Sequence, residues 1–262
     1  MRKFAESWPD YSLVETLISQ IPWRTNLTLI DKVKEPDVRR WYAEKILTMG
    51  LSRSMLEIQI EARLHEREGK ATNNFDLTIP EHDSDLVAHT FKDPYVFDFL
   101  AQSDVRRESD LEQQLIEHIH KFLVELGQGF AFVGRQVLLE IGDSDFYADL
   151  LFYHLRLRCF VVVELKVGKF EPGHVGQLNM YIQAVEELLR HKTDKPTIGL
   201  LLVKTRDEMV VEYSLNGYNS PISVANWQQN TADLQRKEIL ESLPSIEEIQ
   251  LELGIESDED DE

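Results

Sequence analysis

Three charged residues lie within apolar segments that are typical of buried strands. Asp149 interrupts the aromatic and aliphatic segment 146–153, and Glu164 and Lys166 lie two residues apart in the apolar segment 159–167. Charged groups in such strands are costly unless they pair with each other or bind a metal ion. Carboxylates suit Mg²⁺ or Mn²⁺, and a nearby lysine can hold or deprotonate a water, or stabilise charge on a phosphate. The alternative is a buried Glu–Lys ion pair without catalysis.

Strand geometry predicts that these three side chains meet. Residues two apart in a strand share a face, so Glu164 and Lys166 should point the same way. Asp149 lies on the preceding predicted strand, and if the two strands pair, one acid from each reaches a common point. The two carboxylates and the backbone carbonyl between Glu164 and Lys166 would then form an oxygen-rich site for a divalent cation.

A further carboxylate is expected from a helix that starts at Ser109 or Asp110 and runs to about Leu126. An advance of 100° per residue places Glu112 inside the apolar arc of this helix and Glu117 outside it. Two interpretations stay open for Glu112. It could bind a metal ion or its water, or it could be a carboxylate favoured by the dipole at a helix N-terminus.

Two polar residues are expected on one face of a later helix, over 176–191. Gln177 and Tyr181 are spaced i, i+4, so they lie together beside the apolar stripe. Glutamine can orient a water or a phosphate oxygen, and tyrosine can hydrogen-bond or stack. The alternative is that both form the polar rim of the helix.

The helices and strands predicted to carry these residues begin near residue 109. Hydrophobic periodicity and turn residues predict, in order, a helix over 109–126, strands over 130–141, 146–153 and 158–167, a helix over 176–191, and strands over 197–204 and 209–213. This order predicts an α/β domain over 105–245, with a mixed sheet and helices packed on it.

The first 95 residues are predicted to form a mainly α-helical domain. Helices are expected over 11–21, 37–49 and, with Ser52 as N-cap, 52–67; segment 69–85 is expected to be a loop, followed by a turn at 92–94. The last two helices, separated by a short turn at Gly50, form either an ordinary helical hairpin or a DNA-reading helix-turn-helix. In the second case Arg53, Arg63 and Arg67 would lie on or near the reading helix.

The charge of the chain argues against simple, non-specific nucleic-acid binding. The net charge is −19, whereas phosphate binding usually appears as a basic patch. Six of the last seven residues are acidic, so 246–262 is predicted to be an acidic tail. The single cysteine, Cys159, lies in an apolar segment and is predicted to be a core residue, which indicates a reducing, cytoplasmic location. No segment resembles a membrane span or a signal peptide.

Several of these residues also resemble the motifs of a known family. The series Glu112, Asp149, 164–166 and 177–181 resembles the successive motifs of the PD-(D/E)xK nuclease superfamily. Segments 123–130, 149–154 and 176–177 resemble hallmarks of its YhcG-type family, and the N-terminal half resembles the helical N-terminal domain of that family. Compared with longer members, the chain starts abruptly and is expected to lack an upstream helical segment.

The resemblance implies a restriction-endonuclease-like fold and Mg²⁺-dependent (or Mn²⁺-dependent) hydrolysis of DNA phosphodiester bonds through a metal-bound water. Asp149 and Glu164 would be metal ligands and Lys166 the catalytic lysine. Glu112 would be an outer acid or third ligand, and Gln177 a supporting residue. The N-terminal domain would bind DNA, a protein partner or a second subunit.

Two other functions remain open from the sequence. One is a non-catalytic nucleic-acid-binding protein that keeps the nuclease fold. The other is a protein-interaction module whose acidic surface engages a basic partner, for which the net charge of −19 is the main support.

Overall fold

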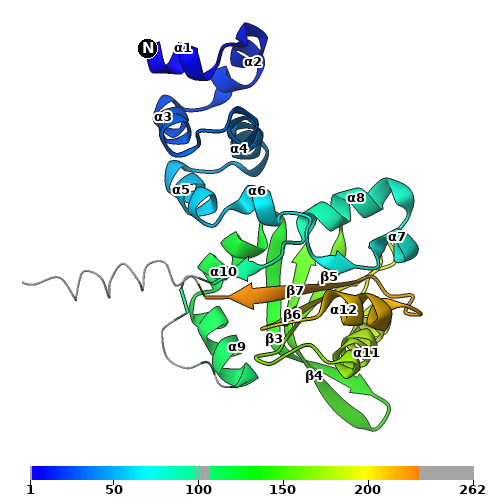
Figure 1. Ribbon diagram of the computed structural model, residues 1–262. Helices are drawn as coiled ribbons and strands as arrows, with labels where there is room; N and C mark the ends of the chain where they lie inside the picture. Colours follow the sequence, from blue (N-terminus) through cyan, green and yellow to red (C-terminus); the bar gives the residue numbers. More distant parts are fainter. Residues whose placement is uncertain (1, 98, 101–104, 106, 230–262) are drawn as a thin grey trace, which may run out of the picture. The chain divides into compact units, whose positions relative to one another are not determined.

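The computed structural model describes residues 2–97, 99–100, 105 and 107–229 (Figure 1). The predicted acidic tail, 246–262, lies outside them. The N-terminal part is helical, as predicted, with a core of its own around Leu29, Tyr42 and Leu56. Its elements are α1 (Arg2–Ser7), α2 (Tyr11–Thr16), the 3₁₀ helix η1 (Ile18–Gln20), α3 (Trp23–Lys32), α4 (Pro36–Met49), α5 (Arg53–Glu61) and α6 (Leu64–Arg67).

Two of the predicted N-terminal helices are shorter than expected. The helix over 11–21 divides into α2 and η1 at Leu17. Ser52 is the N-cap of α5, since its Oγ accepts a hydrogen bond from the Met55 amide at 3.3 Å. The helix does not run on to Arg67, because Arg63 adopts a left-handed conformation with φ of 50° between α5 and α6. Helix α3 was not predicted.

Arg67 is buried and therefore not available to read DNA. Its guanidinium donates to the carbonyls of Ala62 and Pro94 and forms an ion pair with Glu125 at 2.5 Å. Arg53 forms an ion pair with Glu57 of the same helix, and Arg63, which precedes α6, forms an exposed one with Glu66. For Arg67 the structure supports the helical-hairpin interpretation rather than the DNA-reading one.

The predicted loop over 69–85 is wrong. The segment contains β1 (Thr72–Asn73) and α7 (Phe75–Thr78), and α8 (Glu81–Thr90) begins within it. Pro80 precedes α8, and two acidic residues in the first turn suit the helix dipole. Phe75 in α7, together with Val87 and Phe91 at α8, is buried in the main core, and the polar residues between these side chains obscure that pattern in the sequence.

A mixed sheet forms the centre of the second half, as predicted. It contains β3 (Phe130–Ile141), β4 (Ser144–His154), β5 (Cys159–Leu165), β6 (Ile198–Val203) and β7 (Ile222–Gln228), in the order β1-β7-β6-β5-β4-β3. The short strand β2 (Tyr95–Val96) also pairs with β7. Strands β3, β4 and β5 are antiparallel, whereas β5, β6 and β7 are parallel.

Helices pack on the two faces of this sheet (Figure 1). One core contains apolar residues of α9 (Glu108–Glu117) and α10 (Ile119–Leu126), and the other contains those of α11 (Pro172–Leu188) and α12 (Glu208–Leu215). Strand β5 serves both cores, because Val161 and Val163 join the first and Val162 the second. This alternation follows from the two-residue period of a strand.

Two predicted elements of this half need correction, and one strand is additional. The helix over 109–126 is interrupted at His118, and Arg107 rather than Ser109 or Asp110 holds the N-cap position. The strand over 209–213 is instead part of α12, whose N-cap Asp207 accepts a hydrogen bond from the Val210 amide at 3.3 Å. The sheet position beyond β6 belongs to β7, which was not predicted. Among the residues described, no helix is long and apolar enough to cross a membrane.

Candidate active site

The pairing of β4 with β5 brings Asp149 to the end of β5. Leu150 lies opposite Val163 in this antiparallel pair, so Asp149 is next to the segment that carries Glu164 and Lys166. The Asp149 Oδ2 accepts a hydrogen bond from the backbone amide of Leu165 at 2.9 Å. The two strands therefore pair as expected, and Asp149 lies beside the end of β5 that carries Glu164. Burial raises the pKa of Asp149.

Glu164 is the most buried acid of this group, with 1% of its surface exposed. Its Oε1 accepts hydrogen bonds from Lys166 Nζ and Gln177 Nε2, both at 2.9 Å. Its Oε2 is also buried, and no donor within the described residues reaches it. Burial, together with the negative charge of Asp149, raises the pKa of Glu164 to about 7. One carboxylate oxygen thus lacks a partner in a place where a negative charge is unfavourable.

Lys166 lies on the same side as Glu164, as the strand period predicted. Burial alone would lower the pKa of Lys166, but the Glu164 carboxylate 2.9 Å away, together with the negative charges of Asp149 and Glu108, raises it above the ordinary value. The ammonium is therefore charged. The Glu–Lys ion pair considered as an alternative does exist, yet it leaves both the unpartnered Glu164 oxygen and the adjacent Asp149 without an explanation.

Gln177 and Tyr181 on α11 form a hydrogen-bonded chain that leads to Glu164. The Nε2 of Gln177 donates to Glu164 Oε1 and to Tyr181 Oη, each at 2.9 Å. Tyr181 is buried, and its contact with Glu164 runs through Gln177. The predicted shared face of these two residues is confirmed. The helix starts earlier than predicted because Glu171 occupies the N-cap position and Pro172 the first turn.

Glu112 lies on the buried side of α9, as helical geometry predicted, with 8% of its surface exposed. Burial raises the pKa of Glu112, and the nearby Asp149 adds to the effect. The Glu112 Oε2 accepts a hydrogen bond from Gln136 Nε2 at 2.6 Å, and the same nitrogen donates to Asp149 Oδ1 at 3.2 Å. Glu112 therefore reaches the site through Gln136.

Two residues of this region were not predicted from the sequence. Gln136 lies on β3, and no spacing rule connects it with Glu112 or Asp149. Glu108 precedes Glu112 by one helical turn, and its negative charge acts on Asp149, Glu164 and Lys166. The i, i+4 spacing of the two glutamates on α9 could have identified Glu108.

The donor set is suited to a hard cation but is small. Within the described part of the chain, no group of three or more His, Cys, Asp or Glu residues is arranged to hold a metal ion. Asp149 and Glu164 nevertheless provide two adjacent carboxylates, one with an unpartnered buried oxygen. Mg²⁺ retains several waters and is usually bound through one or two carboxylates, so these two residues fit it.

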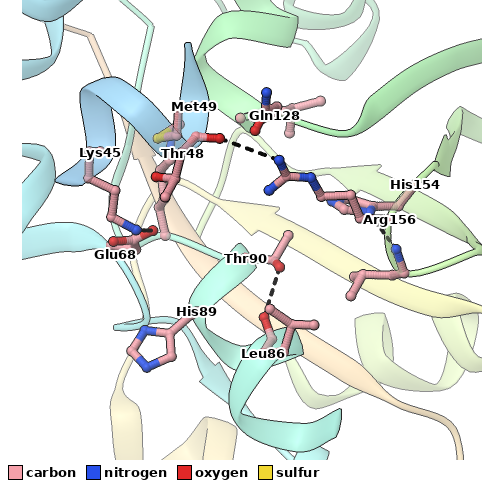
Figure 2. A pocket seen from close by; sticks show the side chains of 14 residues that line it. Lys45, Thr48, Met49, Glu68, Leu86, His89, Thr90, Gln128, His154 and Arg156 are labelled. Atoms are coloured by element: carbon pink, nitrogen blue, oxygen red, sulfur yellow. Dashed lines mark hydrogen bonds and ion pairs between the residues drawn. The ribbon is translucent and has the colours of Figure 1, made fainter. Parts of the chain in front are cut away.

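The cavity drawn in Figure 2 lies apart from these residues. It has a volume of about 260 Å³, and its lining includes Lys45, Glu68, Lys92, His154 and Arg156 but none of the six predicted site residues. Three of its charged side chains already have partners: Lys45 pairs with Glu68 at 2.6 Å, and Arg156 donates to the Thr48 carbonyl at 3.3 Å. The concentration of buried acids, rather than this cavity, marks the candidate active site.

Two solved structures resemble the chain weakly. A repair endonuclease from Pyrococcus abyssi is 16% identical, with a TM-score of 0.31 over 49% of each chain. A structure titled as a complex of EndoMS with double-stranded DNA is 17% identical, with a TM-score of 0.32 over 51% of this chain and 48% of that one. These TM-scores are too low to support an inference about function.

The sequence relatives are informative. Residues 88–244 match the model of the YhcG PDDEXK nuclease domain, and residues 1–67 match the DUF1016 N-terminal domain. The protein named "Putative nuclease YhcG" from Escherichia coli (strain K12) is 35% identical over 235 residues, which are 87% of this chain. The match spans 62% of the length of that relative. The chain therefore belongs to the YhcG family of PD-(D/E)xK nucleases.

Proposed function

We propose that this protein hydrolyses phosphodiester bonds of DNA with the help of Mg²⁺ or Mn²⁺, at the site formed by Asp149, Glu164 and Lys166. The observation that carries the proposal is Glu164, a buried acid with one unpartnered oxygen beside a second carboxylate. A binding module without catalysis has no need of this arrangement, because it destabilises the folded protein. A bound cation with oxygen ligands would offset the cost of burying these two carboxylates.

Each residue has a role that follows from its contacts. Asp149 and Glu164 would hold the cation, which when bound activates water and offsets charge on the phosphate. Lys166 is charged, so it stabilises negative charge on the phosphate rather than acting as a base. Gln177, itself held by Tyr181, fixes the orientation of the Glu164 carboxylate.

The wider organisation belongs to the same proposal. Residues 105–245 would form the nuclease domain, and residues 1–95 would bind DNA, a partner protein or a second subunit. The buried Arg67–Glu125 ion pair supports a fixed connection between α6 and α10. Glu112 would act as an outer acid or third ligand, and the protein would work in the cytoplasm.

Cleavage assays test the proposal directly. Linear, nicked, branched and single-stranded DNA are incubated with the protein in Mg²⁺, Mn²⁺ or chelator. Asp149→Ala and Lys166→Ala should each reduce cleavage by at least about a hundredfold. The matched controls are Asp143→Ala and Lys192→Ala, at exposed positions outside the site, which should retain it.

Two outcomes would contradict the proposal. Equal cleavage by wild type and both site variants would mean that the activity comes from a contaminant or from another site. Binding of DNA without cleavage of any substrate would favour the non-catalytic alternative.

A further inference from the structure

Gln136 lies opposite Asp149, at a point where the pairing of β3 with β4 is interrupted. Arg135 pairs with Leu150 and Val137 with Ala148 in one continuous register, whereas Gln136 and Asp149, which face each other between them, do not form a ladder pair. Its φ is +43°, in the left-handed region that residues with a side chain rarely adopt. Such a conformation persists only where the surroundings impose it, and it often accompanies a functional role.

The Gln136 amide joins two acids that repel each other. Its Nε2 donates to Glu112 at 2.6 Å and to Asp149 at 3.2 Å, and these acids come from different elements, α9 and β4. The negative charge of Asp149 disfavours ionisation of Glu112, so the two carboxylates would separate without a donor between them. A neutral amide with two N–H groups can bridge them without adding charge.

We propose that Gln136 is a positioning residue that tethers Glu112 to Asp149 and so makes Glu112 part of the active site. The functional meaning of the tether rests on the proposed function, whereas its existence does not. Gln136 is not the residue that stability alone would select at this position, because glycine adopts a positive φ without strain. The tether therefore predicts that stability and divalent-cation binding change in opposite directions when Gln136 is replaced by glycine.

Thermal unfolding in chelator and calorimetric titration with Mn²⁺ separate the two effects. Gln136→Gly should raise Tm by about 2 to 4 °C through relief of strain. The same variant should weaken Mn²⁺ binding and DNA cleavage by about 10- to 100-fold, because the Glu112 carboxylate is no longer held. Gln136→Leu, which keeps the size but removes the donor, should lose binding without the gain in Tm.

Arg158→Gly is the matched control. Arg158 also has a positive φ, of 56°, and lies before β5, at the end of that strand remote from Glu164. Its replacement should raise Tm without changing Mn²⁺ binding or cleavage. A purely structural role for Gln136 would instead make Gln136→Gly behave like Arg158→Gly.

A double-mutant cycle tests whether Gln136 acts through Glu112. In a Glu112→Leu background, Gln136→Leu should add little further loss of Mn²⁺ binding, and the two Tm changes in chelator should be non-additive. If the Tm changes are non-additive but the wild-type protein neither binds Mn²⁺ nor cleaves DNA, the link between Gln136 and Glu112 is supported and the proposed function is rejected. Additive Tm changes, with binding and cleavage retained in Gln136→Leu, would reject the tether and keep the proposed function.

Discussion

Replacement of Glu164 by glutamine should stabilise the protein at alkaline pH when no divalent cation is present. Glu164 is 1% exposed, and its pKa is raised to about 7 from 4.5, first by burial and then by the charge of Asp149. The unfolded chain therefore ionises this acid at a lower pH than the folded one. The stability that the protonated acid contributes is fully present below pH 4.5 and is lost as pH rises through 7.

The size of the effect follows from the shift. A difference of about 2.5 pKa units corresponds to roughly 3 kcal/mol, or about 6 to 12 °C in Tm for a domain of this size. Glutamine cannot ionise and has almost the same shape as protonated glutamate. At about pH 5 the free energy of unfolding of Glu164→Gln should therefore be similar to that of wild type. At about pH 8 it should exceed that of wild type by about 3 kcal/mol.

The assay is urea unfolding in chelator at about pH 5 and about pH 8, followed by circular dichroism. Glu44→Gln, on the exposed side of α4, is the matched control and should change the free energy by no more than about 0.5 kcal/mol at either pH. Saturating Mn²⁺ should raise the stability of wild type at the higher pH but not that of Glu164→Gln. If Glu164→Gln is less stable than wild type at the higher pH in chelator, the acid is stabilised as an ordinary ion pair and the reasoning is wrong.

Two further predictions concern regions outside the active site. Burial lowers the pKa of His154 to about 4, so wild type should lose up to about 3 kcal/mol as pH falls from 6.5 towards 4. His154→Gln should lack this part of the pH dependence in urea unfolding, and equal slopes in the two proteins would contradict it. Arg67→Met should cost about 3 to 5 kcal/mol, because it leaves Glu125 buried without its partner. Arg63→Met, at an exposed ion pair, should cost no more than about 0.5 kcal/mol, and similar thermal stabilities of the two variants would refute the role of the buried pair.

Much of the candidate active site could be predicted because its residues follow local periods. Glu164 and Lys166 share a side of the chain through the two-residue period of a strand. Glu112 falls on the buried side of α9 through the helical period, even though the helix ends earlier than expected. Gln177 and Tyr181 meet because they are four residues apart on α11. In each case the geometry depends on neighbours within one element.

Other features escaped prediction because they depend on distant parts of the chain. Segment 209–213 is apolar enough for a strand, but Asp207 caps a helix there and β7 occupies the next place in the sheet. From the sequence, Arg67 is predicted to be a surface arginine. In the structure it is buried because it pairs with Glu125, which lies on a helix far along the chain. The helical segment after residue 69 depends on three buried side chains that polar residues separate in the sequence.

Residue types and spacing alone predict that Glu164 and Lys166 share a face and that Glu112 lies on the buried side of its helix, because the periods of a strand and of a helix are properties of the backbone. The meeting of Asp149 with Glu164 depends on the pairing of β4 with β5. How these groups are charged and held depends instead on the packing of segments that are distant in the sequence. The raised pKa of Glu164 results from burial by other elements and from Asp149 on a neighbouring strand. The bridge from Glu112 to Asp149 is made by Gln136, which has a left-handed conformation, and it joins side chains from α9, β3 and β4. Burial and charge depend on residues that come together only when the chain folds.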